Sequence, residues 1–318
     1  MADKTKILID CDPGHDDAVA ILFAARRLEL VGITTVHGNN TVANTTRNAL
    51  SVLALAGLDV PLAQGLADPL AMKRIDVAAM HGKSGLDGAT LPEPVARPIA
   101  TPAVDYIIET ASRLRGELVV ALVGPQTNFA AALKREPKLA TWVREITIMG
   151  GSATLGNITP AAEFNVYADP EAAAAVFACG APIRMVGYNV TRLTGFDQGD
   201  IDRMKGSGRR VAGTIADLMA FYLERQRRTF GLTVAPMHDV CAVVPYVAPD
   251  FIRYVETTVQ VELAGTLTRG MTVCDMRTVR PGAKSDVKVA GTPNARVALE
   301  SQNRPLIDLV VDTLLEYP

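Results

Sequence analysis

The regular alternation of strand and helix patterns constrains the fold of this chain most. The runs "KILIDCD" at 6–12 and "LVGITTV" at 30–36 read as buried strands, and helical patterns follow them at 16–28 and 41–57. Pro13 and Gly14 force the first turn, and Gly57 is a typical helix stop. The same patterns predict strands at 117–124, 145–151 and 182–187, and helices at 170–180, 209–230 and 304–316.

This alternation predicts an α/β fold of the doubly wound, Rossmann-like type. Helices should flank both faces of a mostly parallel central sheet. Residues 255–263 and 270–275 predict a small antiparallel addition near the C-terminus, and the Pro- and Gly-rich segment 82–102 predicts a surface loop. With no internal repeat or low-complexity linker, we expect a single domain over residues 1–318.

Composition narrows the class of protein. The chain has 318 residues, 48% of them hydrophobic and 21% charged, which is typical of a globular protein with a sizeable core. A net charge of -2 gives no electrostatic reason to expect a nucleic-acid partner, and "RQRR" at 225–228 reads as the solvated face of a helix.

The chain shows no sign of export or membrane insertion. The start "MADKTKILID" lacks the pattern of a signal peptide, and no apolar run reaches the ~18 residues that span a membrane. The cysteines, Cys11, Cys179, Cys241 and Cys274, are widely spaced, which argues against a zinc site or a disulfide framework. We therefore expect reduced thiols and a cytoplasmic location, with no membrane partner.

Polar residues follow several of the predicted strands. Such residues occur in "HGNN" at 37–40, "GPQTN" at 124–128 and "GGSATLGNITPAAEFN" at 150–165. In open α/β sheets, ligands bind beyond the carboxyl ends of the strands. This recurrence predicts a ligand site at that edge of the sheet.

The stretch "DCDPGHDD" at 10–17 places four carboxylates at the end of the first strand. An EF-hand calcium loop does not fit, because loop position 6 would be His15 and position 12 would be Ile21. A phosphoryl-transfer site with an aspartate nucleophile lacks the later acidic pair that it needs. A metal site remains, with Asp12 and Asp17 as ligands and Asp16 facing the substrate. Alternatively, Asp16 and Asp17 only favour the positive end of the helix dipole.

A His–Asp pair strengthens the metal interpretation. In "PMHDV" at 236–240, Asp239 is another hard oxygen ligand, and His238 beside it is available as a proton donor. Oxygen ligands without cysteine or a histidine cluster favour calcium or magnesium over zinc.

Taken together, these motifs resemble the inosine–uridine-preferring family of nucleoside hydrolases. The resemblance covers about three quarters of the chain. Its matching stretches are "DCDPGHDDAVAI" (10–21), "ITTVHGN" (33–39), "HGKSGLDG" (81–88), "VGPQTN" (123–128), "IMGG" (148–151), "GNITPAAEFNVYADPEAA" (156–173) and "HDV" (238–240).

The resemblance implies a Ca²⁺ site and two catalytic residues. Asp12 is implied to bridge the metal and to act as general base, and His238 to face the leaving base. Asp17, Asp239 and the backbone carbonyl of Thr127 are implied as the other protein ligands.

The resemblance also implies a set of substrate contacts. His81 is a second candidate for facing the base, Met149 alone would also suit a core position, and Asn39 alone would suit a turn. The implied set is Asp16, Asn39, Asn157, Glu163 and Asn165 around the ribose, Met149 against the sugar, His81 and Gln226 toward the base, and Asp10 supporting the site from behind.

The implied reaction is hydrolysis of the N-glycosidic bond of ribonucleosides to ribose and free base, by Ca²⁺-bound water that Asp12 activates. His15, "HGKSGLDG" and Gln226 favour uridine and cytidine, with inosine also a substrate. Phe230 departs from the tyrosine of some pyrimidine-leaning relatives. The family implies nucleoside salvage and a homo-oligomer, a dimer or a tetramer. The rival hypothesis is a catalytically silent nucleoside- or sugar-binding protein on the same fold.

Overall fold

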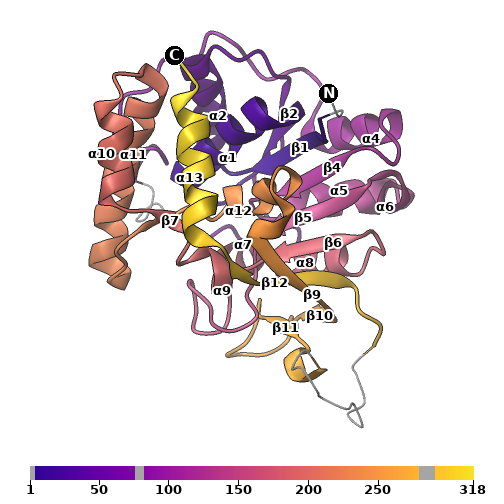
Figure 1. The fold of residues 1–318 in the computed structure, drawn as a ribbon. Coiled ribbons are helices and arrows are strands. Elements are labelled where there is room, and N and C mark those ends of the chain that lie inside the picture. Colours follow the sequence, from indigo (N-terminus) through magenta and orange to yellow (C-terminus); the bar gives the residue numbers. More distant parts are fainter. Residues whose placement is uncertain (1–3, 76–81, 279–290) are drawn as a thin grey trace.

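An eight-stranded sheet runs through the middle of the molecule (Figure 1). The structure, a computed structural model, describes residues 4–75, 82–278 and 291–318. The strand order is β3-β2-β1-β4-β5-β6-β12-β9, and neighbouring strands are parallel except for β9, which runs antiparallel to β12. The strands are β1 (Lys6–Cys11), β2 (Glu29–Thr35), β3 (Leu62–Gln64), β4 (Val119–Leu122), β5 (Glu145–Met149), β6 (Ile183–Val186), β9 (Ile252–Thr257) and β12 (Ala295–Ser301).

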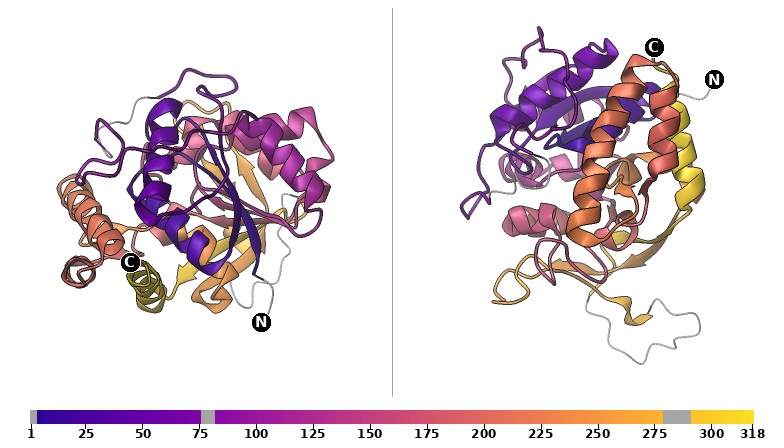
Figure 2. Two further views of the ribbon diagram at one scale, coloured as in Figure 1. Left: turned by 90° about the horizontal axis from the view of Figure 1, so that it is seen from above. Right: turned by 90° about the vertical axis from the view of Figure 1, so that its left-hand side faces the viewer.

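Helices cover both faces of the sheet and enclose two apolar cores (Figure 2). Alternate side chains of β1 enter different cores, Ile7 and Ile9 on one face and Leu8 on the other. The first core is covered by α1 (His15–Arg27), α2 (Val42–Ala56), α10 (Gln198–Gly206), α11 (Arg210–Phe230), α12 (Val240–Val243) and α13 (Asn303–Leu315). The second is covered by α4 (Ala103–Arg113), α5 (Thr127–Arg135), α6 (Leu139–Trp142) and α8 (Pro170–Phe177).

The predicted α/β class and the antiparallel addition are confirmed. The addition is divided, because β9 joins the main sheet while β10 (Val259–Val261) pairs with β11 (Thr272–Cys274) in a separate ribbon. A second ribbon joins β7 (Gly195–Phe196) to β8 (Ala235–Pro236). The sequence patterns missed β12, whose side chains alternate irregularly between buried and exposed positions.

Local chemistry explains the first strand–turn–helix unit. The Asp17 carboxylate accepts hydrogen bonds from the backbone N–H groups of Gly14 (2.8 Å) and Asp12 (3.2 Å), and so caps α1. At the end of α2, Gly57 adopts a left-handed conformation with φ of 64°, as the sequence predicted.

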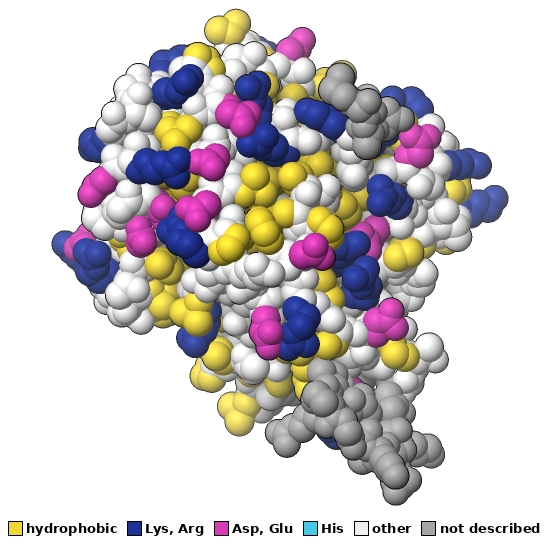
Figure 3. Space-filling view, viewed as in Figure 1, with side chains coloured by type: hydrophobic (Ala, Val, Ile, Leu, Met, Phe, Trp, Pro, Cys, Tyr) yellow, Lys and Arg dark blue, Asp and Glu magenta, His cyan; other side chains and the backbone are white. Residues whose placement is uncertain are grey.

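The surface shown in Figure 3 mixes both signs of charge and carries an apolar area near its centre. That area lies over the turns after α12, η1 (Val244–Tyr246) and η2 (Pro249–Phe251), where the Val247 side chain is exposed. Among the helices that the structure describes, none combines the length and apolar character needed to cross a membrane.

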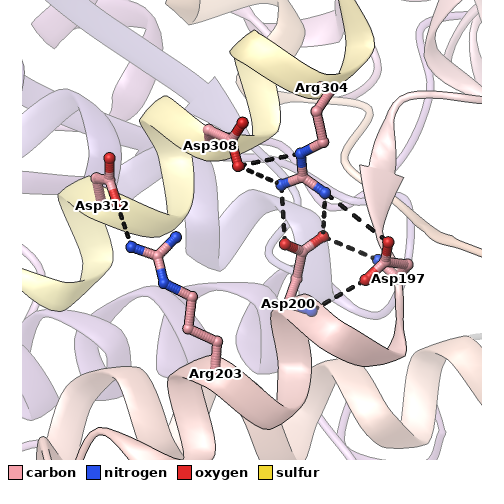
Figure 4. Close-up of polar contacts among 6 residues, drawn as sticks. All are labelled: Asp197, Asp200, Arg203, Arg304, Asp308 and Asp312. Atoms are coloured by element: carbon pink, nitrogen blue, oxygen red, sulfur yellow. Dashed lines mark hydrogen bonds and ion pairs between the residues drawn. The ribbon is translucent and has the colours of Figure 1, made fainter.

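An ion-pair network joins α10 to α13 (Figure 4). The Arg304 guanidinium donates to both Asp200 oxygens, at 2.8 and 3.0 Å, and to Asp308 at 3.0 Å. Nearby, Arg203 donates to Asp312 at 2.6 Å. Because α11 follows α10 directly, this network also anchors the helix that forms one wall of the pocket described next.

Candidate active site

A pocket of about 310 Å³ opens at the carboxyl ends of the strands. The strand order reverses between β1 and β4, which is the position where open α/β sheets bind ligands. Asp12 follows β1, Val123 follows β4, Met149 ends β5 and Tyr188 follows β6. The pocket is lined by Asp12, Asp16, Asn39, Val123, Met149, Asn157, Ile158, Glu163, Phe164, Asn165, Tyr188, Tyr222, Gln226, Phe230, His238 and Asp239.

Three carboxylates from two distant parts of the chain meet beside this pocket. One oxygen from each of Asp16, Asp17 and Asp239 lies within 4.8 Å of the other two. The first two residues occupy the first turn of α1, and Asp239 precedes α12. All three side chains are buried, so the protein concentrates like charge in a poorly solvated place.

Asp12 lies in the same pocket and is held by Asn39. Its Oδ2 accepts a hydrogen bond from the Asn39 backbone N–H at 2.6 Å, and Asn39 Nδ2 donates to the Asp12 carbonyl at 3.2 Å. Gly38 and Gly124 leave room for the carboxylate, because a Cβ at either position would collide with it. The strand-end motifs at 10–17 and 37–40 therefore converge as the sequence predicted.

The electrostatics of this cluster call for a cation. Burial raises the pKa of Asp16 to about 8 and that of Asp17 to about 6, and it raises those of Asp12 and Asp239 well above the usual range. Mutual repulsion adds to the effect for Asp12, Asp16 and Asp239. Each of these shifts favours the protonated, neutral carboxyl group over the charged one when no cation is bound. A divalent cation would replace those protons.

The donor set fits a hard divalent cation. The clustered atoms are carboxylate oxygens, and no cysteine or histidine belongs to the cluster among the residues that the structure describes. Ca²⁺ and Mg²⁺ both prefer such ligands.

Asp10 lies behind the pocket. Its Oδ1 accepts hydrogen bonds from Thr34 Oγ1 (2.6 Å) and Asn128 Nδ2 (2.8 Å), while burial raises the pKa of Asp10 to about 7. It does not line the cavity, which agrees with a supporting position.

Thr127 begins α5, at the end of the β4 segment. Its hydroxyl donates to Asp169 Oδ2 at 2.8 Å and lies 3.0 Å from His37 Nε2. Leu70 N–H donates to the same Asp169 oxygen at 2.9 Å. These buried contacts fix the start of α5, whose Thr127 carbonyl is the ligand that the family resemblance implies.

A second group of polar side chains forms another part of the wall. Glu163 caps α7 (Phe164–Ala168) and accepts hydrogen bonds from Asn165 N (3.0 Å) and Gly151 N (2.8 Å). Burial raises the pKa of Glu163 to about 7. Asn165 Nδ2 donates to the carbonyls of Val123 (2.8 Å) and Met149 (3.0 Å). These bonds order Glu163 and Asn165 before any ligand arrives.

The long helix α11 supplies a third wall. Tyr222, Gln226 and Phe230 recur every four residues and share one helical face toward the pocket. The His15 ring stacks on Tyr222 at a centroid distance of 5.2 Å, and its Nε2 lies 2.8 Å from the Asp87 carbonyl. His15 therefore connects the first acidic turn, the loop at 82–88 and α11.

His238 projects its imidazole ring into the pocket. Its Nδ1 lies 2.7 Å from Thr191 Oγ1, and its ring lies 5.8 Å from that of Tyr188. Burial lowers the pKa of His238 to about 4, so the ring is neutral near pH 7. A neutral imidazole here can donate a hydrogen bond to a ligand.

Most residues singled out from the sequence lie at this pocket. Asp17, Thr127 and Asp10 lie outside its lining, and His81 lies outside the described residues. Sequence reasoning missed the apolar and aromatic walls. Tyr222 could have been predicted to line the pocket, because it lies one helical turn before Gln226 on the same helix. The residues brought to the pocket are Asp12, Asp16, Asn39, Met149, Asn157, Glu163, Asn165, Gln226, His238 and Asp239, and those missed are Val123, Ile158, Phe164, Tyr188 and Tyr222.

Comparisons with known proteins find similarity to nucleoside hydrolases over nearly the whole chain. Residues 7–306 match the family model described as inosine-uridine preferring nucleoside hydrolase. The chain is 39% identical over 315 residues to the pyrimidine-specific ribonucleoside hydrolase RihA of Salmonella typhimurium, covering 98% of each protein. RihA of Escherichia coli O1:K1 / APEC is also 39% identical, with the same coverage.

Solved structures show the same similarity in three dimensions. A plant nucleoside hydrolase, PpNRh1, superposes with a TM-score of 0.89 at 32% identity, covering 98% of this chain and 99% of that chain. A purine-preferring ribonucleoside hydrolase from Gardnerella vaginalis gives a TM-score of 0.89 at 28% identity, covering 98% of both chains.

Proposed function

The chain belongs to the inosine-uridine preferring nucleoside hydrolase family and is an enzyme of that class, and we propose that it hydrolyses uridine and cytidine to ribose and free base. Inosine is a slower substrate in this proposal. The choice of base is supported by 39% identity to proteins named pyrimidine-specific, against 28% to one named purine-preferring.

The metal in this proposal is Ca²⁺, held by Asp12, Asp17, Asp239 and the Thr127 carbonyl. The oxygen-only cluster and its unfavourable charge support this choice. Asp16 also lies in the cluster, so it faces both the cation and the substrate. When bound, the ion would offset the acidic charge and polarise a water molecule and the ribose hydroxyls.

Asp12 acts as the general base and takes a proton from the attacking water. Its carboxylate lines the pocket and is fixed by the Asn39 N–H, which supports this role. Cleavage of an N-glycosidic bond develops positive charge on the ribose. Fixed oxygens around the sugar stabilise that charge. They come from Asp16, Asn39, Asn157, Glu163 and Asn165.

His238 assists departure of the base. Nδ1 is occupied by Thr191, so Nε2 is the ring nitrogen available to a ligand in the pocket. The neutral Nε2–H can donate a hydrogen bond to the nitrogen or oxygen on which negative charge develops.

One observation carries this proposal: in the buried cluster of Asp16, Asp17 and Asp239, two members, Asp16 and Asp239, line the same pocket as Asp12 and His238. The test is release of reducing sugar from uridine, cytidine and inosine in the presence of Ca²⁺. We expect turnover of all three, fastest with the two pyrimidine nucleosides. Binding of uridine by calorimetry without ribose release would instead favour the silent binding protein, and faster inosine cleavage would overturn the preference.

The proposed setting is nucleoside salvage in the cytoplasm, by a homo-oligomer whose subunits are single domains of residues 1–318. The four cysteines are free thiols, in keeping with a reducing compartment. The apolar area over η1 and η2 supports self-association (Figure 3). Light scattering should give the mass of a dimer or tetramer, and a monomer at micromolar concentration would contradict this part.

A further inference from the structure

A short helix, α9 (Tyr188–Thr191), holds the imidazole of His238 from two sides. Thr191 Oγ1 lies 2.7 Å from Nδ1 at the ring edge. The Tyr188 ring packs beside it, tilted by 34° at a centroid distance of 5.8 Å. Within residues 4–75, 82–278 and 291–318, Nε2 has no hydrogen-bond partner, so it remains available to a ligand.

Within the described residues, the Thr191 hydroxyl makes no hydrogen bond to a carbonyl of its own helix. Thr214 and Thr313 donate to the carbonyl four residues earlier in their own helices, at 2.8 and 2.7 Å. Thr191 is fully buried, and His238 Nδ1 is its only side-chain partner in the described part of the chain. Its hydroxyl is therefore committed to the histidine.

Hydrogen-bond accounting fixes the direction of this contact. If Nδ1 carried the proton, the Thr191 hydroxyl would accept, and its own hydrogen would have no acceptor in the described interior. A buried donor without a partner is costly. If the hydroxyl donates to Nδ1, both groups are satisfied and the ring hydrogen lies on Nε2.

The backbone around the pair is also fixed. The β7–β8 ribbon pairs Gly195 with Pro236. The Met237 N–H donates to the Thr194 carbonyl at 2.8 Å. These bonds join the segment after Thr191 to the segment before His238, so the two side chains keep their spacing.

We propose that Thr191 is a positioning residue that holds His238 in the Nε2–H tautomer and aims that N–H at the departing base. The inference rests on the leaving-group role of His238 in the proposed function. Thr191 is not among the residues that line the pocket. It acts by setting which ring nitrogen donates, as second residues do for other catalytic histidines.

The test compares Thr191→Val, which keeps the shape and removes the hydroxyl, with Thr191→Ser, which keeps the hydroxyl. On uridine, Thr191→Val should lower kcat roughly tenfold with little change in KM, as expected for one lost orienting hydrogen bond. On a nitrophenyl riboside, whose aglycone leaves unaided, it should change kcat less than about twofold. Thr191→Ser should restore most of the uridine rate.

A second measurement reads the tautomer without turnover. The chain has four histidines, so ¹⁵N-labelled imidazole signals can be assigned by substitution. His238 should show the Nε2–H pattern in the Ca²⁺-loaded wild-type enzyme and in Thr191→Ser, and a mixture in Thr191→Val.

Three results would overturn the inference: an Nδ1–H pattern in the wild type, an unchanged uridine rate in Thr191→Val, or equal losses on both substrates. A wild-type protein that releases no ribose would refute the proposed function instead. The imidazole signals would still decide whether Thr191 sets the tautomer.

Discussion

Burial has opposite consequences for the stability and the chemistry of Asp12, Asp16, Asp17 and Asp239. A poorly solvated site strengthens every electrostatic interaction with a substrate. The same burial raises the pKa of each carboxyl group and opposes folding without a counter-charge. Residues that lower the stability of the fold without any structural benefit are expected at functional sites.

Replacing Asp12 by asparagine should separate these two effects. The variant keeps an oxygen for the Asn39 N–H but loses the proton acceptor and one charge of the cluster. Turnover of uridine should fall by at least about 10²-fold. The melting temperature in EDTA should rise, because one repelling charge is removed. Asp59→Asn, at an exposed position, is the matched control and should change neither quantity. Near-parental turnover by Asp12→Asn would show that another group is the base.

His238→Ala tests the leaving-group role independently of Thr191. Uridine hydrolysis should slow by about 10²–10³-fold, the usual cost of losing one hydrogen-bond donor aimed at developing negative charge. Hydrolysis of a nitrophenyl riboside should change only a few-fold, since its aglycone leaves without a hydrogen bond from the enzyme. Steady-state rates on both substrates, measured side by side with Ca²⁺ present, provide the comparison. If both rates fall together, His238 positions the site or supports the fold.

At the scale of elements, the network between α10 and α13 supports the pocket from a distance. Arg304 bonds to both oxygens of Asp200, whose side chain is only 8% exposed (Figure 4). Helix α11 follows α10 and carries Tyr222, Gln226 and Phe230. Loss of the network should therefore affect stability first and base binding second.

Arg304→Gln should lower the free energy of unfolding by about 1–3 kcal/mol, because Asp200 is left buried without its cation. Arg203→Gln breaks the neighbouring pair with Asp312, in which both side chains are about half exposed, and should cost less than about 1 kcal/mol. Urea unfolding of both variants measures the difference. Equal costs would mean that Asp200 is solvated well enough to tolerate the loss.

Elements with strong local signals could be predicted from the sequence, and elements that depend on distant packing could not. The Pro13–Gly14 turn and the α11 pattern at 209–230 carry their own signals, and the structure has α1 at His15–Arg27 and α11 at Arg210–Phe230. Helix α9 has four residues, which is too few to show a helical periodicity in the sequence. The position of Tyr188 and Thr191 beside His238 could therefore not be predicted.

At the scale of the whole molecule, the C-terminal residues pack against α1, near the start of the chain. The Tyr317 hydroxyl donates to the Leu22 carbonyl at 2.7 Å, and Glu316 pairs with Arg26 and Arg27 at 2.9 and 2.6 Å. Strand β12, late in the chain, lies beside β6 in the main sheet. Folding must therefore bring together many residues that lie far apart in the sequence.

This arrangement predicts one cooperative unfolding transition for residues 1–318. Trp142, the single tryptophan, lies on α6 at the second core, while far-UV circular dichroism reports all helices. Urea curves from the two probes should coincide. Separate midpoints would show that the two faces of the sheet unfold independently and would contradict a single domain.

The bound cation should control the pH dependence of global stability, because the cluster joins α1 to the segment before α12. An unfolded aspartate titrates near ~3.9, whereas the metal-free fold holds Asp17 at a pKa of about 6 and Asp16 at about 8. Between these values the two carboxyl groups bind more protons in the folded than in the unfolded state, so their contribution to stability falls as pH rises from about 4 to 8. Ca²⁺ binds the deprotonated carboxylates, so the stability that it adds to the folded state grows over the same pH range.

Melting temperatures in EDTA and in Ca²⁺ should diverge from pH 5 to pH 8, and Asp239→Asn should remove most of that divergence. Glu163 and Asp10, each with a pKa of about 7 and neither among the proposed ligands, should contribute equally with and without Ca²⁺. Parallel curves with and without Ca²⁺ would mean that the acids of this pocket hold no calcium.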